Sequence, residues 1–171
     1  MTLLDEMAVI GLGANLGQPL ETLGQALKRL YQASELSLVV VSSVYLTEPQ
    51  GGPSGQNWYH NAVAFFRCCL EPRPLLELLL DIEKSLGRER LERWGPRVID
   101  LDLLALGRRI VDQAPDLIVP HPRMTERLFV MAPLAETAPD WRHPIGGKTA
   151  ASLLAAIDQT GQGIKRTSFR L

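Results

Sequence analysis

The stretch WYHNAVAFFRCCLEPRPLLELLLDIEKSLG, from Trp58 to Gly87, contains the two elements on which the prediction of the fold depends. Its first part, residues 58–70, is dominated by aromatic and other apolar side chains, as is typical of a strand. Its second part, residues 72–87, carries leucine or isoleucine at every third or fourth position, so these side chains share one face of a helix. Pro74 suits the first turn of that helix, and the final glycine is placed to end it. We therefore predict a strand followed by an amphipathic helix.

The segments before this stretch show the same alternation of strand and helix. Residues 7–13, MAVIGLG, predict a short buried strand that ends in a glycine turn, and residues 19–33 predict a helix with leucines on one face. Residues 36–47, LSLVVVSSVYLT, are rich in β-branched side chains and predict another strand.

The segments after the stretch add one strand and two helices. Residues 98–106 predict a buried strand, residues 119–136 begin as a loop and end as a helix, and residues 149–158 predict a last short helix. The order βαββαβ with a helical tail predicts an α+β fold, a ferredoxin-like sandwich of an antiparallel sheet with helices on one face and extra C-terminal helices. The order alone also allows a doubly wound sheet.

Composition excludes several classes of protein. The 171 residues fit one domain, 1–171, and the 46% hydrophobic content is that of an ordinary globular protein. A net charge of -1 provides no global attraction to nucleic acid or to a membrane surface. No apolar run approaches the ~20 residues of a membrane span, and the N-terminus lacks the basic region of a secretory signal. The adjacent Cys68 and Cys69 are expected to be reduced thiols, so we expect a cytoplasmic protein.

Two glycine-rich segments resemble nucleotide-binding motifs without matching them. In GLGANLG, residues 11–17, the third glycine stands one residue too late for the dinucleotide fingerprint, and a tight packed turn is the preferred interpretation. GGKT, residues 146–149, lacks the earlier glycine of a P-loop and is interpreted as a turn before the last helix. A nucleotide would therefore bind without a Walker cradle.

The segment RWGPRVIDLDLLAL, from Arg93 to Leu106, reads as a buried strand that carries two carboxylates. Asp100 and Asp102 are spaced i and i+2, so they point to the same face of the strand. Two adjacent ionised carboxylates repel, and Mg²⁺ prefers oxygen ligands of this kind together with substrate phosphates. A solvated face of an ordinary antiparallel strand explains the spacing equally well, so both interpretations remain open.

Basic residues are concentrated just before these carboxylates. Residues 84–97 contain five basic and two acidic side chains in a protein of net charge -1. Arginine forks match phosphate oxygens in two-point geometry, and cations beside a carboxylate metal site are components of phosphoryl transfer. The alternative is a solvated charged loop.

Aromatic and amide side chains suggest a site for a planar ring. Tyr59 and Asn61 share one face of their strand, and Trp94 and Phe129 are further candidates for an apolar slot. Together they favour a stacked heterocycle whose edge is hydrogen-bonded, although each aromatic on its own is explained by core packing.

The run R-W-G-P-R-x-x-D-x-D in residues 93–102 resembles the signature of the 6-hydroxymethyl-7,8-dihydropterin pyrophosphokinases of the folate pathway. The resemblance extends over nearly the whole chain. It includes GLGANLG, SSVYLTEPQGGPSGQNWYHNAV, IEKSLGRERLERWGPR and VPHPRMTERLFVMAPLAE.

The resemblance implies a ferredoxin-like fold and the transfer of pyrophosphate from ATP to the pterin hydroxymethyl oxygen, giving AMP. It implies that Asp100 and Asp102 bind two Mg²⁺ ions and that Arg88 and Arg97 are catalytic arginines. Asp102 could also deprotonate the pterin hydroxyl, or the metal could suffice. The implied pterin contacts are Thr47, Tyr59, Asn61, Trp94 and Phe129. The implied nucleotide contacts are Glu83, Arg88, Arg97, Leu103, His121 and Arg127.

Two other classes of function compete with this hypothesis. A nucleotidyltransferase or nuclease could use the same D-x-D pair, but it needs a nucleic-acid-binding surface that the near-neutral charge does not provide. A non-catalytic binding module would leave the aspartates and arginines without a joint purpose. We therefore expect a monomeric enzyme whose partners are ATP and a pterin, without nucleic acid or membrane.

Overall fold

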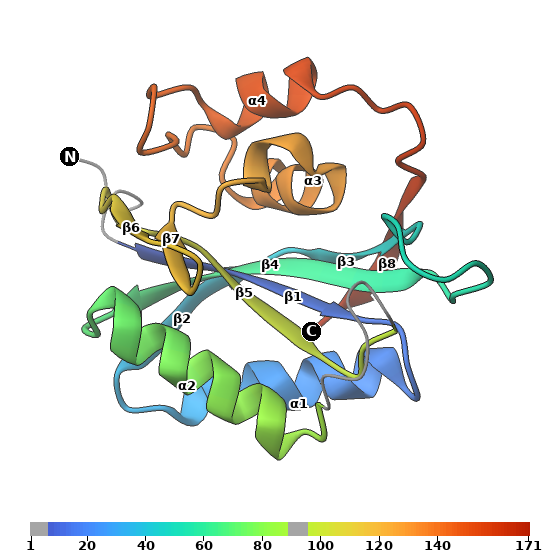
Figure 1. Cartoon of the computed structure of the whole chain (residues 1–171), viewed down its shortest axis with the longest axis horizontal. Helices are drawn as coiled ribbons and strands as arrows, with labels where there is room; N and C mark the ends of the chain where they lie inside the picture. The colour runs from blue at the N-terminus through green and yellow to red at the C-terminus, as the bar shows by residue number, and fades with distance from the viewer. Residues whose placement is uncertain (1–6, 89–95) are drawn as a thin grey trace.

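The computed structural model describes residues 7–88 and 96–171, which form an antiparallel sheet between two layers of helices (Figure 1). The helices are α1 (Pro19–Gln32), α2 (Pro72–Ser85), the short 3-10 helix η2 (Met124–Glu126), α3 (Leu128–Thr137) and α4 (Ala150–Ala156). The strands are β1 (Met7–Ala14), β2 (Leu36–Val41), β3 (Ser43–Thr47), β4 (Tyr59–Cys68), β5 (Asp100–Leu106), β6 (Val111–Gln113), β7 (Leu117–Val119) and β8 (Ile164–Arg170).

The strand order confirms the ferredoxin-like prediction. The main sheet runs β5-β1-β4-β3-β8, and β2 also pairs with β4. If β2 and β3 are taken as one interrupted strand, the βαββαβ strands occur in the spatial order fourth, first, third, second, and every pairing between them is antiparallel. Both predicted βαβ helices, α1 and α2, pack on the same face (Figure 1).

The prediction that helices cover only one face is wrong for the C-terminal part, because α3 and α4 cover the opposite face (Figure 1). The strands are apolar on both sides. In β1, Ala8, Ile10 and Leu12 join the core with α1 and α2. Met7 and Val9 join a second core with α3 and α4. Since both faces of the central strands are apolar, each face needs a layer of helices to remove it from water.

The predicted strand 36–47 is two strands, β2 and β3, interrupted at Ser42. The Val63 amide donates to Ser42 Oγ across 3.0 Å, and the Ser42 amide donates to the Val63 carbonyl across 2.9 Å. The serine hydroxyl therefore satisfies a β4 amide where the ladder changes register.

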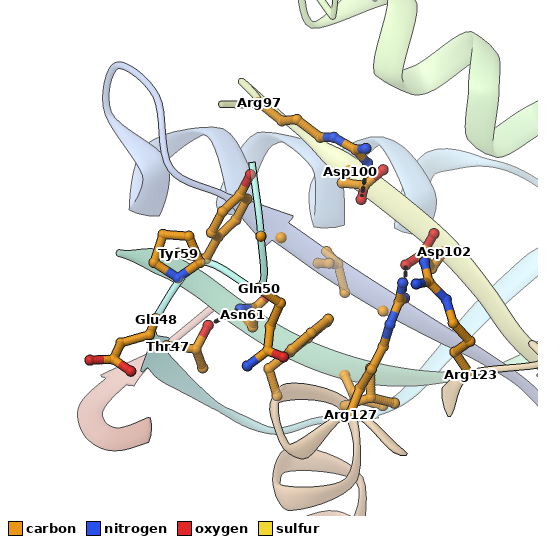
Figure 2. Close-up of a pocket in the computed structure, with 18 of the residues that line it drawn as sticks. Thr47, Glu48, Gln50, Tyr59, Asn61, Arg97, Asp100, Asp102, Arg123 and Arg127 are labelled. Atoms are coloured by element: carbon orange, nitrogen blue, oxygen red, sulfur yellow. Dashed lines mark hydrogen bonds and ion pairs between the residues drawn. The ribbon is translucent and has the colours of Figure 1, made fainter. Parts of the chain in front are cut away.

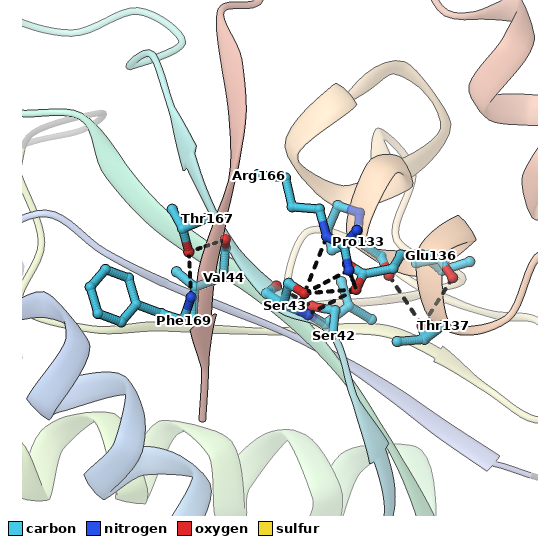
Figure 3. A network of polar contacts seen from close by, with 11 residues as sticks. Ser42, Ser43, Val44, Pro133, Glu136, Thr137, Arg166, Thr167 and Phe169 are labelled. Carbon is cyan, nitrogen blue, oxygen red and sulfur yellow. Dashed lines mark hydrogen bonds and ion pairs between the residues drawn. The ribbon is translucent and has the colours of Figure 1, made fainter.

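The final strand β8 was missed, and so was the small hairpin β6–β7. Strand β8 pairs with β3 at the edge of the sheet and has no fully buried side chain, so it lacks the apolar alternation that marks a strand in a sequence. Polar contacts hold it in place (Figure 3). Arg166 Nη2 and Ser43 Oγ reach Glu136 Oε1 at 2.7 and 2.8 Å, and Thr167 Oγ1 donates to the Val44 carbonyl at 2.7 Å.

Other local predictions are confirmed with small shifts. Helix α2 begins at Pro72 with Pro74 in its first turn and ends at Ser85, and Gly87 follows its end with a φ of 87°. Cys68 and Cys69 are both free. None of the helices in the described ranges is long and apolar enough to cross a membrane.

Candidate active site

A cavity of about 770 Å³ lies on the side of the sheet that carries α3. Its walls come from β1, β4 and β5, from the loop after β3, and from the segment that includes η2 and the start of α3. Figure 2 shows Asp100 and Asp102 with Arg97, Arg123 and Arg127 at one end. Thr47, Tyr59 and Asn61 lie at the other end.

Both β5 carboxylates face this cavity. Asp100 and Asp102 line it, whereas Leu101 between them is 4% exposed and belongs to the core on the α1–α2 side. The alternation is that of an ordinary antiparallel strand. The polar face of this strand lines a cavity that also holds arginines.

Asp100 is paired with two arginines. Arg88 Nη1 lies 2.8 Å from Asp100 Oδ1, and Arg97 Nη1 lies 2.6 Å from Asp100 Oδ2. Each oxygen of the carboxylate therefore accepts a charge-assisted hydrogen bond from a different guanidinium.

Asp102 is less well compensated. Its nearest ion-pair partner among the described residues is Arg127, at 3.7 Å. Burial, together with the negative charges of Asp100 and Glu83, raises the pKa of Asp102 to about 7, although Arg127 and Arg97 act to lower it. A carboxylate pair of this kind gains most from a bound cation.

The donor set fits Mg²⁺. In the part of the chain that the structure describes, no third Asp, Glu, His or Cys joins the two aspartates to form a larger metal cluster. Two carboxylates, completed by water and substrate phosphates, are the coordination that Mg²⁺ commonly has in phosphoryl-transfer sites. Asp100 and Asp102 would hold the metal.

Glu83, which the resemblance implied as a nucleotide contact, is a buried residue of α2. It is 2% exposed and does not line the cavity. Its Oε1 accepts a hydrogen bond of 2.6 Å from the Leu101 amide and pairs with Arg88. Glu83 therefore positions Arg88 and the start of β5. Leu103 is also buried in the α1–α2 core, outside the cavity lining.

Asn15 holds the backbone of Arg97. The Arg97 amide donates to Asn15 Oδ1 at 2.8 Å, and the Asn15 amide donates to the Arg97 carbonyl at 3.0 Å. Asn15 Nδ2 donates to the Asn57 carbonyl at 3.0 Å. This side chain is 1% exposed and joins three loops. Sequence reasoning missed it because no motif rule links positions that far apart.

The pterin-side residues predicted on β3 and β4 are in contact. Asn61 Nδ2 donates to Thr47 Oγ1 at 2.6 Å, and Asn61 is 7% exposed. A Cβ on Gly13 would come within 2.6 Å of Asn61 Oδ1, so only glycine leaves room for this amide. The expected glycine turn is therefore partly wrong. Gly11 and Gly13 lie inside β1, and Gly17 has the turn conformation, with a φ of 65°.

The segment that precedes α3 adds cations and a histidine. The Arg127 guanidinium lies 5.4 Å from the centroid of the Phe129 ring, a cation–π contact. Burial lowers the pKa of His121 to about 4, helped by the charges of Arg127 and Arg123. The Arg123 amide donates to His121 Nδ1 at 3.2 Å, so the neutral ring carries its proton on Nε2 and can donate it to an acceptor.

Most of the predicted site residues meet in this one cavity. Its lining includes Thr47, Tyr59, Asn61, Arg97, Asp100, Asp102, His121, Arg127 and Phe129. Trp94 lies outside the described residues. The lining also includes residues that were not predicted, among them Gln50, Arg123, Glu126 and Gly161. The positive charge of Arg123, two residues after His121, could have indicated a site residue. Nothing in the sequence around Gly161 indicates one.

Comparison with known proteins places these features in a family. A family model described as 7,8-dihydro-6-hydroxymethylpterin-pyrophosphokinase (HPPK) matches residues 9–139. A Synechocystis protein named 2-amino-4-hydroxy-6-hydroxymethyldihydropteridine pyrophosphokinase is 44% identical over 153 residues, 90% of this chain and 77% of that protein. Proteins of the same name from Methylorubrum extorquens and Pseudomonas aeruginosa are 43% and 44% identical. They cover 90% and 89% of this chain and 95% and 92% of their own lengths.

Solved structures share the fold at low sequence identity. A Plasmodium falciparum HPPK-DHPS triple mutant has a TM-score of 0.69 and 12% identity, over 87% of this chain and 42% of that chain. An HPPK-DHPS solved in complex with substrates has a TM-score of 0.67 and 13% identity, over 88% of this chain and 42% of that chain. This chain therefore spans less than half the length of those two.

Proposed function

The chain belongs to the 7,8-dihydro-6-hydroxymethylpterin-pyrophosphokinase family, and on this premise we propose that it transfers pyrophosphate from ATP to 6-hydroxymethyl-7,8-dihydropterin. The products are AMP and the pterin diphosphate, an intermediate of folate biosynthesis. The family and its relatives identify the chain as an enzyme, a pyrophosphokinase.

The proposal rests on the observation that one cavity has two chemically different walls. Asp100 and Asp102 with Arg97 and Arg127 form the polar wall, and Arg88 pairs with Asp100 from outside the lining. Tyr59, Asn61 and Phe129 form a wall suited to a flat ring with a hydrogen-bonding edge. A triphosphate on the first wall and a pterin on the second would bring the pterin hydroxyl to the phosphate chain, which is what a transfer between them requires.

On the polar side of the site, Asp100 and Asp102 would hold two Mg²⁺ ions, and Arg97 and Arg88 would bind the transferring phosphate. The metal, when bound, neutralises phosphate charge and polarises the phosphorus under attack. Arg97 and Arg88 act on the charge that develops as the bond to AMP breaks, so their stabilisation is realised mainly in the transition state. The Nε2–H group of His121 donates a hydrogen bond to a phosphate oxygen. The pterin hydroxyl is the nucleophile, so the chain needs no covalent intermediate.

On the pterin wall, Tyr59 and Phe129 contact the two faces of the ring. Asn61 forms hydrogen bonds with the edge of the ring, and Thr47 binds the ring through its backbone. The hydrogen bond from Asn61 to Thr47 supports this assignment, because it leaves the Asn61 carbonyl oxygen, beside Gly13, as an acceptor toward the cavity. We also propose that residues 1–171 form a single pyrophosphokinase domain that works as a monomer in the cytoplasm.

The test is the product formed from ATP. With Mg²⁺ and 6-hydroxymethyl-7,8-dihydropterin the protein should release AMP and one pterin diphosphate per AMP, as measured by chromatography. Omission of the pterin or chelation of the metal should stop AMP release. Release of ADP, or of AMP at the same rate without pterin, would contradict the proposal.

A further inference from the structure

The C-terminal segment between α4 and β8 reaches the cavity from outside the part of the chain that the family model matches. That model covers residues 9–139, whereas Gly161 lines the cavity wall. In Figure 1 the chain runs down from α4, beside α3, to β8 at the edge of the sheet. The segment therefore contributes to the same cavity as the residues to which substrates are assigned.

Gln162 binds the start of α3. The Leu128 amide donates to Gln162 Oε1 at 2.9 Å, and Gln162 Nε2 donates to the Glu126 and Asp158 carbonyls at 3.3 and 2.8 Å. The first amides of a helix have no partner within it, and the capping residue Arg127 makes no side-chain cap here. Gln162 supplies that cap from a distant part of the chain.

The position of this cap matters because of the neighbours of Leu128. Arg127 pairs with Asp102 and stacks on Phe129, so the residues on either side of Leu128 belong to the two walls of the site. Leu128 itself is 4% exposed and packs in the core. A shift of its backbone would move Arg127 and Phe129 together.

The residue after Gln162 binds the loop that follows β3, which also lines the cavity. The Gly163 amide donates to Glu48 Oε2 at 3.1 Å, and the Glu48 amide donates to the Gly163 carbonyl at 2.9 Å. Ile164 then pairs with Thr47. Two consecutive residues thus bind the start of α3 and the loop that follows β3.

We propose that Gln162 is a positioning residue that holds Arg127 and Phe129 in place in the cavity by capping α3 at Leu128. This inference rests on the proposed function for the identity of the two substrates. Gln162 contacts neither substrate, and its effect passes through Arg127 and Phe129.

The test compares Gln162→Ala with Gln159→Ala. Gln159 is an exposed glutamine three residues earlier, and among the described residues its side chain has no hydrogen-bond partner. Both variants are measured at a temperature where each is folded. For Gln162→Ala we expect at least fivefold weaker pterin binding and an at least fivefold slower single-turnover rate. For Gln159→Ala both quantities should stay within twofold of the wild type. A loss of folded protein alone would lower the amplitude but would not change the affinity or the rate constant of the folded fraction.

Gln162→Glu is the second variant. It keeps an acceptor for the Leu128 amide, but it loses both donations and sets a carboxylate oxygen against the Glu126 and Asp158 carbonyls, so its affinity and rate should also fall below those of the wild type. Values for Gln162→Ala equal to those of Gln159→Ala would overturn the proposal. Should Gln162→Ala fail to fold, Gln162→Glu is compared with Gln159→Ala, and equality would again overturn it.

Amide hydrogen exchange at Leu128 separates this inference from the proposed function. In Gln162→Ala this amide should exchange at least tenfold faster than in Gln159→Ala, whether or not the protein turns over ATP. Unchanged exchange would overturn the role of Gln162 even in an active enzyme. An absence of AMP release by the wild type would instead overturn the proposed function.

Discussion

Arg97 Nη1 lies 2.6 Å from Asp100 Oδ2, so a proposed phosphate ligand is paired directly with a proposed metal ligand. Arg88 occupies the other oxygen of the same carboxylate. If Asp100 binds metal in the reaction, both arginines must exchange a carboxylate for a phosphate. The charges of the site then remain balanced before and after substrate binding. Asp100 exchanges its arginines for metal, the arginines exchange the carboxylate for phosphate, and no charged group is left without a partner.

The two aspartates should respond differently to neutralisation. Asp100→Asn and Asp102→Asn should each lower the single-turnover rate at least about a hundredfold, roughly 2.7 kcal/mol, because each removes a metal ligand. In metal-free buffer, Asp102→Asn should melt at or above the wild-type temperature, since it removes a poorly compensated charge. Asp100→Asn should melt lower, since it leaves Arg88 and Arg97 without their partner. Rapid-quench kinetics and thermal melts check both parts, and wild-type rates in either variant would contradict the metal assignment.

The two arginines should also differ. Arg97→Ala should slow the single-turnover rate at least about tenfold, roughly 1.4 kcal/mol, with a smaller change in ATP affinity at equilibrium. Arg88→Ala should slow it similarly and also destabilise the fold by about 3 kcal/mol, because the buried Glu83 loses its cation. The double variant Arg88→Ala with Glu83→Gln keeps an acceptor for the Leu101 amide. Its stability should recover while its rate does not, and a recovered rate would remove Arg88 from the mechanism.

The aromatic wall can be tested by ligand discrimination. Tyr59→Ala and Phe129→Ala should each weaken pterin binding at least several-fold, in line with ~0.5–1.5 kcal/mol for an aromatic contact beyond buried area. ATP binding should change less. Tyr31, a 65% exposed tyrosine on α1, provides the matched control, and Tyr31→Ala should leave both affinities unchanged. Calorimetric titration measures them, and unchanged pterin affinity in both site variants would place the ring elsewhere.

Gly13 should tolerate no side chain. Gly13→Ala puts a Cβ 2.6 Å from Asn61 Oδ1, so the amide must move and pterin affinity should fall at least about tenfold, the loss of roughly one buried hydrogen bond. Gly24 in α1 is the control, because a Cβ there meets nothing within 4 Å. Gly24→Ala should keep pterin affinity and raise stability by up to ~1 kcal/mol. Equal pterin affinity in the two variants would refute the close approach of Gly13 and Asn61.

The contacts that hold β8 should depend on pH. Burial raises the pKa of Glu136, but hydrogen bonds from Ser43 and Tyr45 and the charge of Arg166 outweigh it and leave the pKa below its ordinary value. A depressed pKa means that Glu136 stabilises the fold at neutral pH and that this contribution is lost as pH falls through the folded-state pKa. The difference in unfolding free energy between the wild type and Glu136→Gln should therefore shrink between pH 7 and pH 3. A difference that is constant over this range would exclude an ionised Glu136 from the network.

Periodicity in the sequence was enough to predict the elements that have a strong local pattern. The leucines of α1 and α2 and the apolar run of β4 depend only on neighbouring residues, so these elements were found with shifts of one or two positions. The i, i+2 spacing likewise placed Asp100 and Asp102 on one face, because the strand geometry is local. The long motif around them resembled one family, and the comparisons bear this out.

Only the tertiary structure decided which distant residues support the site. Asn15 binds Arg97, Glu83 holds Arg88, and Gln162 caps α3 at Leu128. Each contact is a hydrogen bond or an ion pair, and the packing of other elements decides which residues meet. No periodic pattern in the sequence indicates which partner a polar side chain will have. Strand β8 was missed for the same physical reason: hydrogen bonds to β3 and a charged network hold it at the edge, and it has no buried apolar face to reveal it in the sequence.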